Sequence, residues 1–326
     1  VSAAFSAHGM ESSLVDSREC IVTDANYTRA APLFDETNQQ LKLALQPLLD
    51  EKRVPVMGGF IGANKAGVTT TIGRGGSDFS AAIIGAALNA DKIEIWTDVD
   101  GMLTTDPRMC PDARRIKVIS FDEAAELAYF GAKVLHPATV LPAIQKNIPV
   151  FVLNSRNASC EGTKITARAP QSRNIFKAIA VKKRITIVDV AAPRRLLLHG
   201  FLKSIFEAFD RHGIAVDVVS TSEVSVSVTM ETNEAIPALS ADLAKLADVK
   251  YEGRKAIICL VGENLRETPG IAARVFGELE DVKIRMISQG ASEINLTFVI
   301  EEDDVQRVIQ RLHNTFFADL DQEVFA

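Results

Sequence analysis

The sequence has few cysteines, no basic excess and no long hydrophobic run. Its four cysteines lie far apart and form no CxxC pair, which argues against a zinc site and predicts free thiols in a reducing, cytoplasmic compartment. The net charge of −6 lacks the basic excess typical of nucleic-acid-binding proteins. No apolar run approaches the roughly 20 residues that a membrane-spanning helix needs. The sequence therefore favours neither a nucleic-acid partner nor a membrane.

What remains is a chain of ordinary globular composition. Its 326 residues are 47% hydrophobic and 24% charged, enough for two domains with buried cores. The first residue is Val1 rather than methionine, and no helix-capping signal accompanies it. We therefore expect the chain to start inside an element, with an N-terminal part of its first domain missing.

The first half alternates β-rich runs with helical patterns. Strands separated by helices predict βαβ units and a mainly parallel sheet with helices on both faces. Ligands of such sheets bind beyond the carboxyl ends of the strands. We therefore expect the polar loops 58–67, 72–77 and 97–108 to cluster at one edge. Strands are expected at 13–17, 54–60, 92–101 and 148–155, helices at 37–52, 77–90, 120–135 and 136–147, and a linker at 156–173.

Two of these helices carry start signals. Ser77 or Asp78 is expected to cap the helix at 77–90. Ser120, with Glu123 three residues on, has the spacing of a capping box.

The second half contains an internal repeat, with copies at 200–230 and 270–300. Each copy starts on glycine, has phenylalanine six residues later and reaches a glutamate 23 residues after the glycine. The pattern predicts a helix followed by two strands, and two copies indicate a pseudo-symmetric pair. A strand precedes each copy and a helix follows it. The expected strands are 176–183, 184–190 and 255–262, and the expected helices are 235–247 and 303–317.

Residues 69–82, "TTTIGRGGSDFSAA", form a glycine-rich turn before a helix. No lysine follows the glycines, as a Walker loop requires, and only the first half of a GxGxxG fingerprint is present. Free N–H groups and the helix dipole still favour an anion, and Arg74 offers a planar fork for a carboxylate. Asp78 could bind an ammonium group or cap the helix. The plain alternative is a tight structural turn.

Two further segments carry polar groups. "WTDVDGMLTTDPR" (96–108) ends in Arg108 and is either a nucleotide-binding segment or a solvated turn. "FGAKVLHP" (130–137) presents Lys133, which could contact a phosphate or be a snorkelling lysine at a helix end. His136 precedes a proline, and this position favours a structural role for the histidine over general-base catalysis.

In order and spacing, "GGFIG", "TTTIGRGGSD", "WTDVDGMLTTDPR", "FGAKVLHPATVLPA" and "STSEVSVSVT" resemble the signatures of the aspartokinases. The resemblance implies an α/β fold. A partial amino-acid-kinase domain at residues 1–172 would precede two α+β (βαββαβ) ACT regulatory domains at 173–326. One ACT unit, about 184–252, would be inserted into the other, about 174–183 plus 253–326.

The resemblance also implies the reaction. An aspartate kinase transfers the γ-phosphoryl group of ATP, with Mg²⁺, to the side-chain carboxylate of L-aspartate, giving 4-phospho-L-aspartate for lysine, threonine and methionine synthesis. The acceptor is already anionic, so no general base is needed. Arg74 and Lys133 would be catalytic, and no residue is assigned to a metal. Aspartate would be held by Arg74, Gly75, Gly76, Ser77 and Asp78, and the nucleotide by Thr97, Asp98, Leu103, Arg108 and Lys133.

The tandem ACT pair implies feedback by an amino acid, either lysine, threonine or both, and a homodimer or larger assembly. Arg195 stands where lysine-binding relatives usually have methionine, and Leu103 where relatives often have tyrosine. The expected effector residues are Phe201, Leu202, Val216, Asp217, Thr221, Ser222 and Glu223.

The family's N-terminal "KFGGTS" segment and its "GE" glutamate are absent from this sequence. We therefore expect residues 1–326 alone to have little kinase activity. The absence also leaves a second hypothesis open, a non-catalytic effector-binding subunit of an aspartokinase. A third is a kinase of the same fold for glutamate or UMP, against which "GRGGSD" and the tandem repeat argue.

Overall fold

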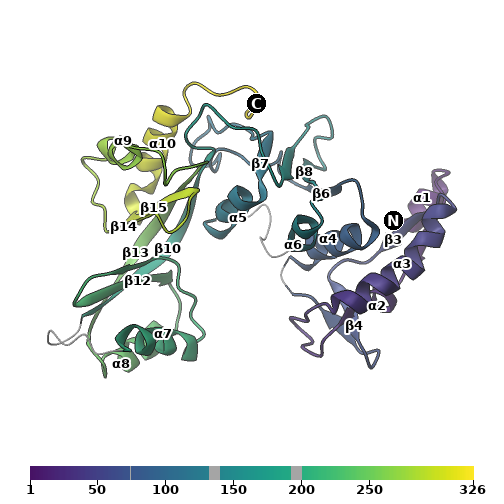
Figure 1. The fold of residues 1–326 in the computed structure, drawn as a ribbon, viewed down its shortest axis with the longest axis horizontal. Helices are drawn as coiled ribbons and strands as arrows, with labels where there is room; N and C mark the ends of the chain where they lie inside the picture. The colour runs from purple at the N-terminus through teal and green to yellow at the C-terminus, as the bar shows by residue number, and fades with distance from the viewer. Residues whose placement is uncertain (74, 132–139, 192–199) are drawn as a thin grey trace. The chain divides into compact units, whose positions relative to one another are not determined.

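The computed structural model describes residues 1–73, 75–131, 140–191 and 200–326 (Figure 1). The chain folds into two compact units. The first contains Val1–Met102, Arg115–Tyr129 and the later chain as far as Pro170. The second contains Leu103–Arg114 and Gln171–Ala326, with a short piece that begins at Phe130.

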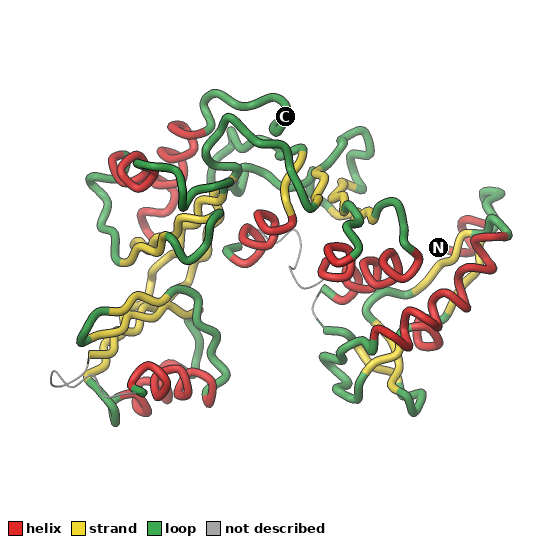
Figure 2. Tube along the Cα trace, viewed as in Figure 1, coloured by secondary structure: helices red, strands yellow, loops and turns green. Residues whose placement is uncertain are grey.

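The first unit is built from short strands and helices in alternation (Figure 2). Four of its strand pairs are parallel, namely β1 with β3, β2 with β4, β6 with β8 and β7 with β9, while β4–β5 and β8–β9 are antiparallel. The expectation of mainly parallel pairing is confirmed. The elements are α1 (Ser2–Ala7), β1 (Ser12–Val15), α2 (Ser17–Cys20), β2 (Val22–Thr23), α3 (Phe34–Asp50), β3 (Val54–Met57), β4 (Ile61–Asn64), β5 (Thr69–Thr71), α4 (Gly76–Leu88), β6 (Ile93–Thr97), β7 (Val118–Ser120), α5 (Phe121–Tyr129), α6 (Leu141–Gln145), β8 (Val150–Asn154) and β9 (Thr163–Thr166).

Helices α3 and α4 pack together through their apolar faces. Leu41 and Leu45, one helical turn apart on α3, are buried against Ile83 and Ala87 of α4. Cys20 of α2 completes this cluster. Burying each of these aliphatic side chains contributes about 1.5–3 kcal/mol, so the cluster holds α4, with its glycine-rich start, in place.

Three details of the first unit differ from expectation. Helix α4 begins at Gly76, with Gly75 as its N-cap and no side-chain cap, so Ser77 and Asp78 lie inside the helix instead of capping it. The expected linker 156–173 contains strand β9, whose Thr163 and Ile165 are fully buried between β8 and β7. The loop expected at 58–67 contains strand β4. Each of these features depends on partners distant in sequence.

The capping box at the start of α5 is confirmed. The backbone N–H of Glu123 donates to the Ser120 hydroxyl at 3.2 Å, and the Glu123 carboxylate accepts from the backbone N–H of Ser120 at 2.9 Å. Helix α5 ends at Tyr129.

The second unit is a six-stranded antiparallel sheet with strand order β11-β12-β10-β13-β15-β14. The two repeat copies become α7-β11-β12 and α9-β14-β15, at opposite edges of the sheet. Helices α7 and α8 lie side by side near one end of it, and α9 and α10 near the other (Figure 1). The elements are β10 (Ala178–Ala191), α7 (Phe201–Arg211), β11 (Val219–Thr221), β12 (Ser225–Glu231), α8 (Ile236–Leu243), β13 (Asp248–Val261), α9 (Ile271–Gly277), β14 (Met286–Gln289), β15 (Asn295–Glu301) and α10 (Val305–Phe316).

Strands β10 and β13 run the length of this sheet. The expected strands 176–183 and 184–190 are one continuous strand, β10, and the strand expected at 255–262 begins seven residues earlier, at Asp248. Their ladder shifts register between Lys182 and Ile185, where Arg184 adopts φ 61°. Pairing with β13 carries the strand through the charged residues Lys182, Lys183 and Arg184.

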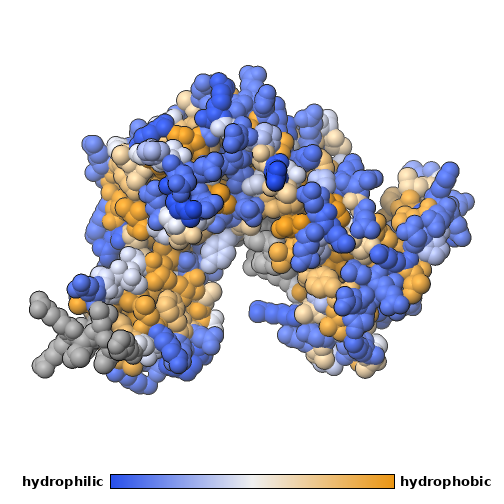
Figure 3. All heavy atoms as spheres, in the orientation of Figure 1, coloured by the Kyte–Doolittle hydropathy of each residue, from blue (hydrophilic) through white to orange (hydrophobic). Residues whose placement is uncertain are grey.

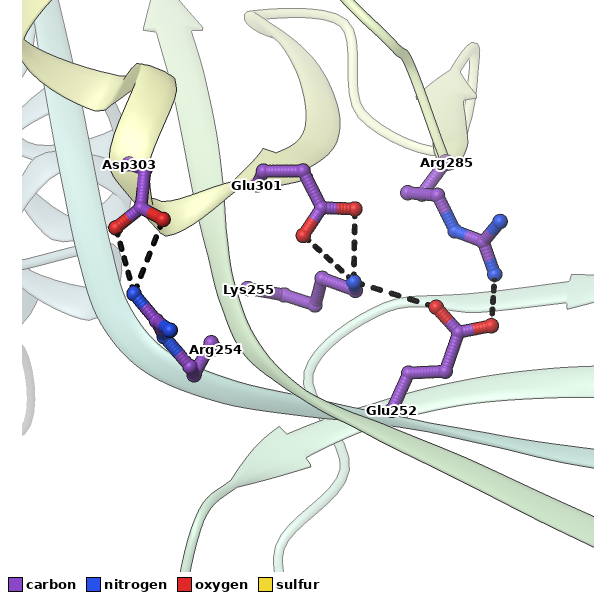
Figure 4. Close-up of polar contacts among 6 residues, drawn as sticks. All are labelled: Glu252, Arg254, Lys255, Arg285, Glu301 and Asp303. Atoms are coloured by element: carbon purple, nitrogen blue, oxygen red, sulfur yellow. Dashed lines mark hydrogen bonds and ion pairs between the residues drawn. The ribbon is translucent and has the colours of Figure 1, made fainter.

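A charged network lies close to this register shift (Figure 4). The ammonium group of Lys255, whose side chain is 7% exposed, contacts Glu301 at 2.7 Å and Glu252 at 3.2 Å. Arg285 donates to the other oxygen of Glu252 at 2.6 Å. One buried cation is therefore paired with two carboxylates.

Apolar side chains are exposed on the second unit. Leu202, Phe206 and Val219 are each more than one third exposed. Figure 3 shows apolar residues over the end of the sheet that carries α7 and α8, and further apolar residues elsewhere among the hydrophilic ones.

Candidate functional site

The start of helix α4 is a tight turn that needs its glycines. Gly75 is left-handed, with φ 71° and ψ 12°. A Cβ atom on Gly76 would lie 2.8 Å from Cβ of Phe60, and one on Gly59 would lie 3.0 Å from Cα of Ser77. The glycines therefore let the Gly58–Phe60 loop pack directly on the helix start.

Ser80 ties this loop to the helix. Its buried hydroxyl donates to Gly76 O at 2.8 Å and accepts from the Phe60 N–H at 3.0 Å. The expected clustering of the 58–67 and 72–77 loops is thus confirmed for Gly58–Phe60 and Gly75–Ser77. The helix start has no side-chain cap, and the backbone N–H groups and dipole at such a helix end favour an anion.

Asp78 is the acidic group of this turn. It is half-buried, and its contact with the Ser77 hydroxyl, at 3.5 Å, is at the limit of a hydrogen bond. Burial raises the pKa of Asp78, and the Ser77 hydroxyl offsets this only in part. A carboxylate whose pKa is raised by burial is stabilised in its charged form by a cationic ligand. Arg74, predicted to bind a carboxylate, lies outside the described residues.

A cavity of about 590 Å³ opens at the carboxyl ends of the parallel strands β1 and β3. Asp16 and Ser17 line it where β1 ends, and Gly58 lines it where β3 ends. The Ser17 hydroxyl donates to Gly58 O at 2.5 Å. Ligands of such sheets bind at this edge. The sequence analysis did not single out these two polar residues, because it placed both in a strand over 13–17. The available signal for a site was that polar residues stand at the end of this strand.

Thr97 and Asp98 stand at the carboxyl end of β6. Thr97 O accepts from the backbone N–H and the hydroxyl of Ser155, at 2.8 and 2.9 Å, which ties β6 to the end of β8. The Thr97 hydroxyl donates to Asp98 at 3.3 Å, and Asp98 is exposed. Both side chains are thus open to a ligand at the strand end.

Asp100 has a structural role that the sequence did not reveal. Its carboxylate accepts from the side-chain amides of Asn154, at 2.7 Å, and Asn157, at 3.3 Å. The Asp-Gly pair signalled a turn but not its partners in the chain after β8.

Leu103 and Arg108 belong to the second unit, because the chain enters that unit at Leu103 and leaves it at Arg114. The Arg108 side chain is 88% exposed and pairs with Asp106 at 2.6 Å. This pairing lowers the pKa of Asp106. The expected clustering of 97–108 with the other two loops therefore stays a prediction for Leu103–Arg108. Lys133 and His136 lie outside the described residues.

The expected effector residues divide into buried and exposed groups. Asp217, with a side chain 2% exposed, is paired with Lys182 at 2.6 Å. Phe201 and Val216 pack against the core of α7, α8 and their strands. The exposed members are Leu202, Thr221, Ser222 and Glu223, and Arg195 falls outside the described residues. Lys182, which the sequence analysis did not single out, is a further candidate for this site.

Within the described ranges no group of three or more histidine, cysteine, aspartate or glutamate side chains could hold a metal ion. None of the helices in this part of the chain is long and apolar enough to span a membrane. All four cysteines are described, and none of them forms a disulfide.

Comparison with known proteins assigns both units. The amino acid kinase family model matches residues 1–154, and an ACT domain model matches residues 258–316. Lysine-sensitive aspartokinase 3 of Escherichia coli is 41% identical over 310 residues, which cover 93% of this chain and 69% of the relative. Chloroplastic aspartokinase 2 of Arabidopsis thaliana is 41% identical over 82% of this chain and 52% of its own length.

Solved structures agree with these relatives. E. coli aspartokinase III in complex with aspartate and ADP superposes with a TM-score of 0.83 at 39% identity, covering 95% of this chain and 71% of that one. The same enzyme with lysine and aspartate gives 0.84 at 39% identity, covering 97% and 72%. The expected fold, an α/β kinase domain followed by an α+β ACT region, is confirmed.

Proposed function

The chain belongs to the aspartokinase family, and we propose that it acts in phosphoryl transfer from MgATP to the side-chain carboxylate of L-aspartate. The observation that carries the proposal is the uncapped start of α4, with Asp78 held beside it. The similar E. coli enzyme has been solved with aspartate and ADP.

We assign aspartate to the helix start. L-Aspartate presents an ammonium group and two carboxylates, and the turn offers Asp78 for the former and backbone N–H groups for a carboxylate. Arg74 stands next to Gly75 in sequence and supplies a bidentate partner. Gly75, Gly76 and Ser77 complete this assignment, because they keep the helix start open.

We assign the nucleotide to Thr97 and Asp98 at the end of β6, to Leu103 and Arg108 in the following segment, and to Lys133. Arg108 is exposed and its guanidinium is held by Asp106, so it is oriented before a phosphate arrives. Mg²⁺ usually keeps waters and binds through substrate phosphates with one or two carboxylates. We therefore propose that Mg²⁺ enters with the nucleotide.

These residues suit the chemistry of the reaction. The acceptor is a carboxylate, so the difficulty is to bring two anions together rather than to remove a proton. Helix N–H groups, Arg74 and Lys133 would offset charge on the transferring phosphoryl group, and binding would align donor and acceptor.

Feedback control is assigned to the ACT region. The E. coli relative has been solved with lysine. In this chain Asp217 is already paired with Lys182 at 2.6 Å. An effector's ammonium group must therefore displace Lys182 or share the Asp217 carboxylate with it. We propose lysine or threonine as effector, and pairing of chains through the ACT region, where the edge strand β11 is exposed along its length.

We further propose that the ACT region is two units, an inserted one at about 184–252 and one made of about 174–183 plus 253–326. The register shift between Lys182 and Ile185 supports the first boundary. The left-handed Arg184 and Arg254, at φ 61° and 55°, support both boundaries.

Tryptophan fluorescence tests the proposal. Trp96 is the only tryptophan, is half exposed and precedes Thr97. We expect ADP to change its emission saturably, and calorimetry to show aspartate binding to the same chain. Arg74→Ala is expected to weaken aspartate about tenfold or more with little effect on ADP, while the exposed Arg168→Ala serves as control.

A chain that binds neither ADP nor aspartate would overturn the function, and an Arg74→Ala effect on ADP alone would overturn the assignment. Calorimetric titration with lysine and with threonine identifies the effector.

A further inference from the structure

The Leu103–Arg114 segment is anchored on the ACT region by contacts remote in sequence. The backbone N–H of Ile179, on β10, donates to Thr104 O at 2.7 Å. The Thr104 hydroxyl lies 2.9 Å from Nε2 of His313, on α10. Thr104 is fully buried and His313 is 3% exposed, so this bond is shielded from water.

One stripe of α10 faces this segment. Gln306 and Gln310 both donate their side-chain amides to Met109 O, and His313 follows one turn later. Positions spaced by four and three residues lie on one face of a helix. The apolar face of α10 meanwhile enters the core of its own unit, through Val308, Ile309 and Leu312.

The Thr104 hydroxyl makes two bonds. It accepts from the backbone N–H of Arg114 at 2.9 Å, and the imidazole tautomer of His313 sets which partner donates in its contact with Nε2. The ring stacks on Phe317, with centroids 4.9 Å apart and planes at 17°. Burial lowers the pKa of His313, which favours its neutral imidazole form.

A second segment meets the same edge of β10. Over Ala178–Lys182, β10 pairs with β13, and its pairing with β12 begins only at Ile185. Gly131, with φ 122°, lies so close that a Cβ atom would sit 2.2 Å from Val181 O. Thus Ile179 and Val181, two residues apart on one strand edge, each meet a segment that neighbours a residue assigned to the nucleotide.

We propose that His313 is a positioning residue for nucleotide binding, which acts through Thr104 on the adjacent Leu103 and on Arg108. This proposal rests on the proposed function, since it takes Leu103 and Arg108 as nucleotide residues. A segment held in its binding conformation before the ligand arrives loses less entropy on binding. The ACT region thereby contributes to ATP affinity directly, through α10 and the edge of β10.

The test measures ADP affinity of the whole chain through Trp96 fluorescence, with aspartate affinity from calorimetry. His313→Ala is expected to weaken ADP about tenfold and to leave aspartate unchanged, because an unpaired buried Thr104 hydroxyl releases the segment. Thr104→Val removes the same bond at almost constant volume, together with the bond from the Arg114 N–H, and is expected to weaken ADP at least as much. Combining the two changes is expected to add little, as for partners in one bond.

The conservative His313→Gln, whose amide can accept the Thr104 hydroxyl, is expected to restore most of the ADP affinity. The control is His212→Ala, which removes a histidine of the same unit that bonds to Asp242 rather than to the segment. It is expected to bind ADP as the unaltered chain does.

Unchanged ADP affinity in both His313→Ala and Thr104→Val, each folded by circular dichroism, would overturn the proposal. If His313→Ala does not fold, Thr104→Val decides alone. Equal weakening of ADP and aspartate would indicate general destabilisation and would also overturn it. Failure of the unaltered chain to bind ADP would instead contradict the proposed function.

Discussion

Asp78, which we propose binds the substrate ammonium group, is expected to carry a cost to stability. Burial raises the pKa of its carboxyl group, which means that the folded state disfavours the charged form. Below its ordinary pKa of 3.8 the carboxyl is neutral in both folded and unfolded chains, so the cost is absent there. The cost appears as the pH rises through the folded-state pKa and persists at neutrality.

We therefore expect Asp78→Asn to raise the melting temperature at pH 7 by roughly 1–3 °C and to weaken aspartate binding about tenfold or more. The gain in melting temperature is expected to vanish near pH 3. Calorimetry measures both quantities. Asp35→Asn, an exposed first-turn aspartate of α3, is the matched control. A lower melting temperature for Asp78→Asn would mean that attraction to the helix dipole outweighs burial.

At the scale of elements, the continuous strands β10 and β13 depend on the charges gathered at their register shift. Lys255 is buried and neutralises Glu301 and Glu252 (Figure 4). Lys255→Met keeps the aliphatic stem but leaves the two carboxylates without this cation. We expect a loss of about 2–3 kcal/mol in the free energy of unfolding measured in urea, below the value for a fully buried pair because both glutamates are about one third exposed or more.

Arg254→Met provides the matched control for this prediction. Arg254 pairs with Asp303 at 2.9 Å close to the same network, but both side chains are nearly 80% exposed. Exposed pairs contribute about 0–1 kcal/mol. A similar loss in both variants would refute the view that burial makes the Lys255 network important.

At the scale of the whole molecule, two kinds of titrating group predict how stability falls with acid. Arg18 and Arg311 hold the pKa values of Asp16 and Asp281 at about 2, so their stabilisation is present above about pH 4 and is lost as the pH falls toward 2. Burial lowers the pKa of His313, so the unfolded chain takes up the proton first and stability falls already below pH 6.5.

Lowering the pH from 7 to 5 is therefore expected to decrease the melting temperature of the second unit, which contains His313, more than that of the first. Scanning calorimetry measures both transitions. The charge of Asp112 favours protonation of His313, and the charge of Arg114 opposes it. In His313→Gln this decline is expected to be smaller, because no proton is taken up there. An unchanged decline in His313→Gln would contradict the view that His313 causes this loss of stability.

Local features of the site were predictable from the sequence. The glycine turn at Gly73–Gly76 and the capping box of Ser120 and Glu123 involve residues within a few positions, so their spacing alone carries the signal. The repeat was visible because each copy needs the same alternation of apolar residues to cover its part of the sheet. Strand β9 was missed because its burial comes from β7 and β8 rather than from its own four residues.

By itself the sequence determined the alternation of strands and helices, the glycine turn before α4 and membership of a kinase family with an ACT region, because these rest on short-range spacing and motif order. The tertiary structure alone decided that Leu103–Arg114 packs with the second unit, that Lys182 pairs with Asp217 and that His313 meets Thr104. The last two contacts join residues 35 and 209 positions apart. Such contacts form because buried polar groups must find partners wherever the fold brings them, and no local pattern records which partner that is.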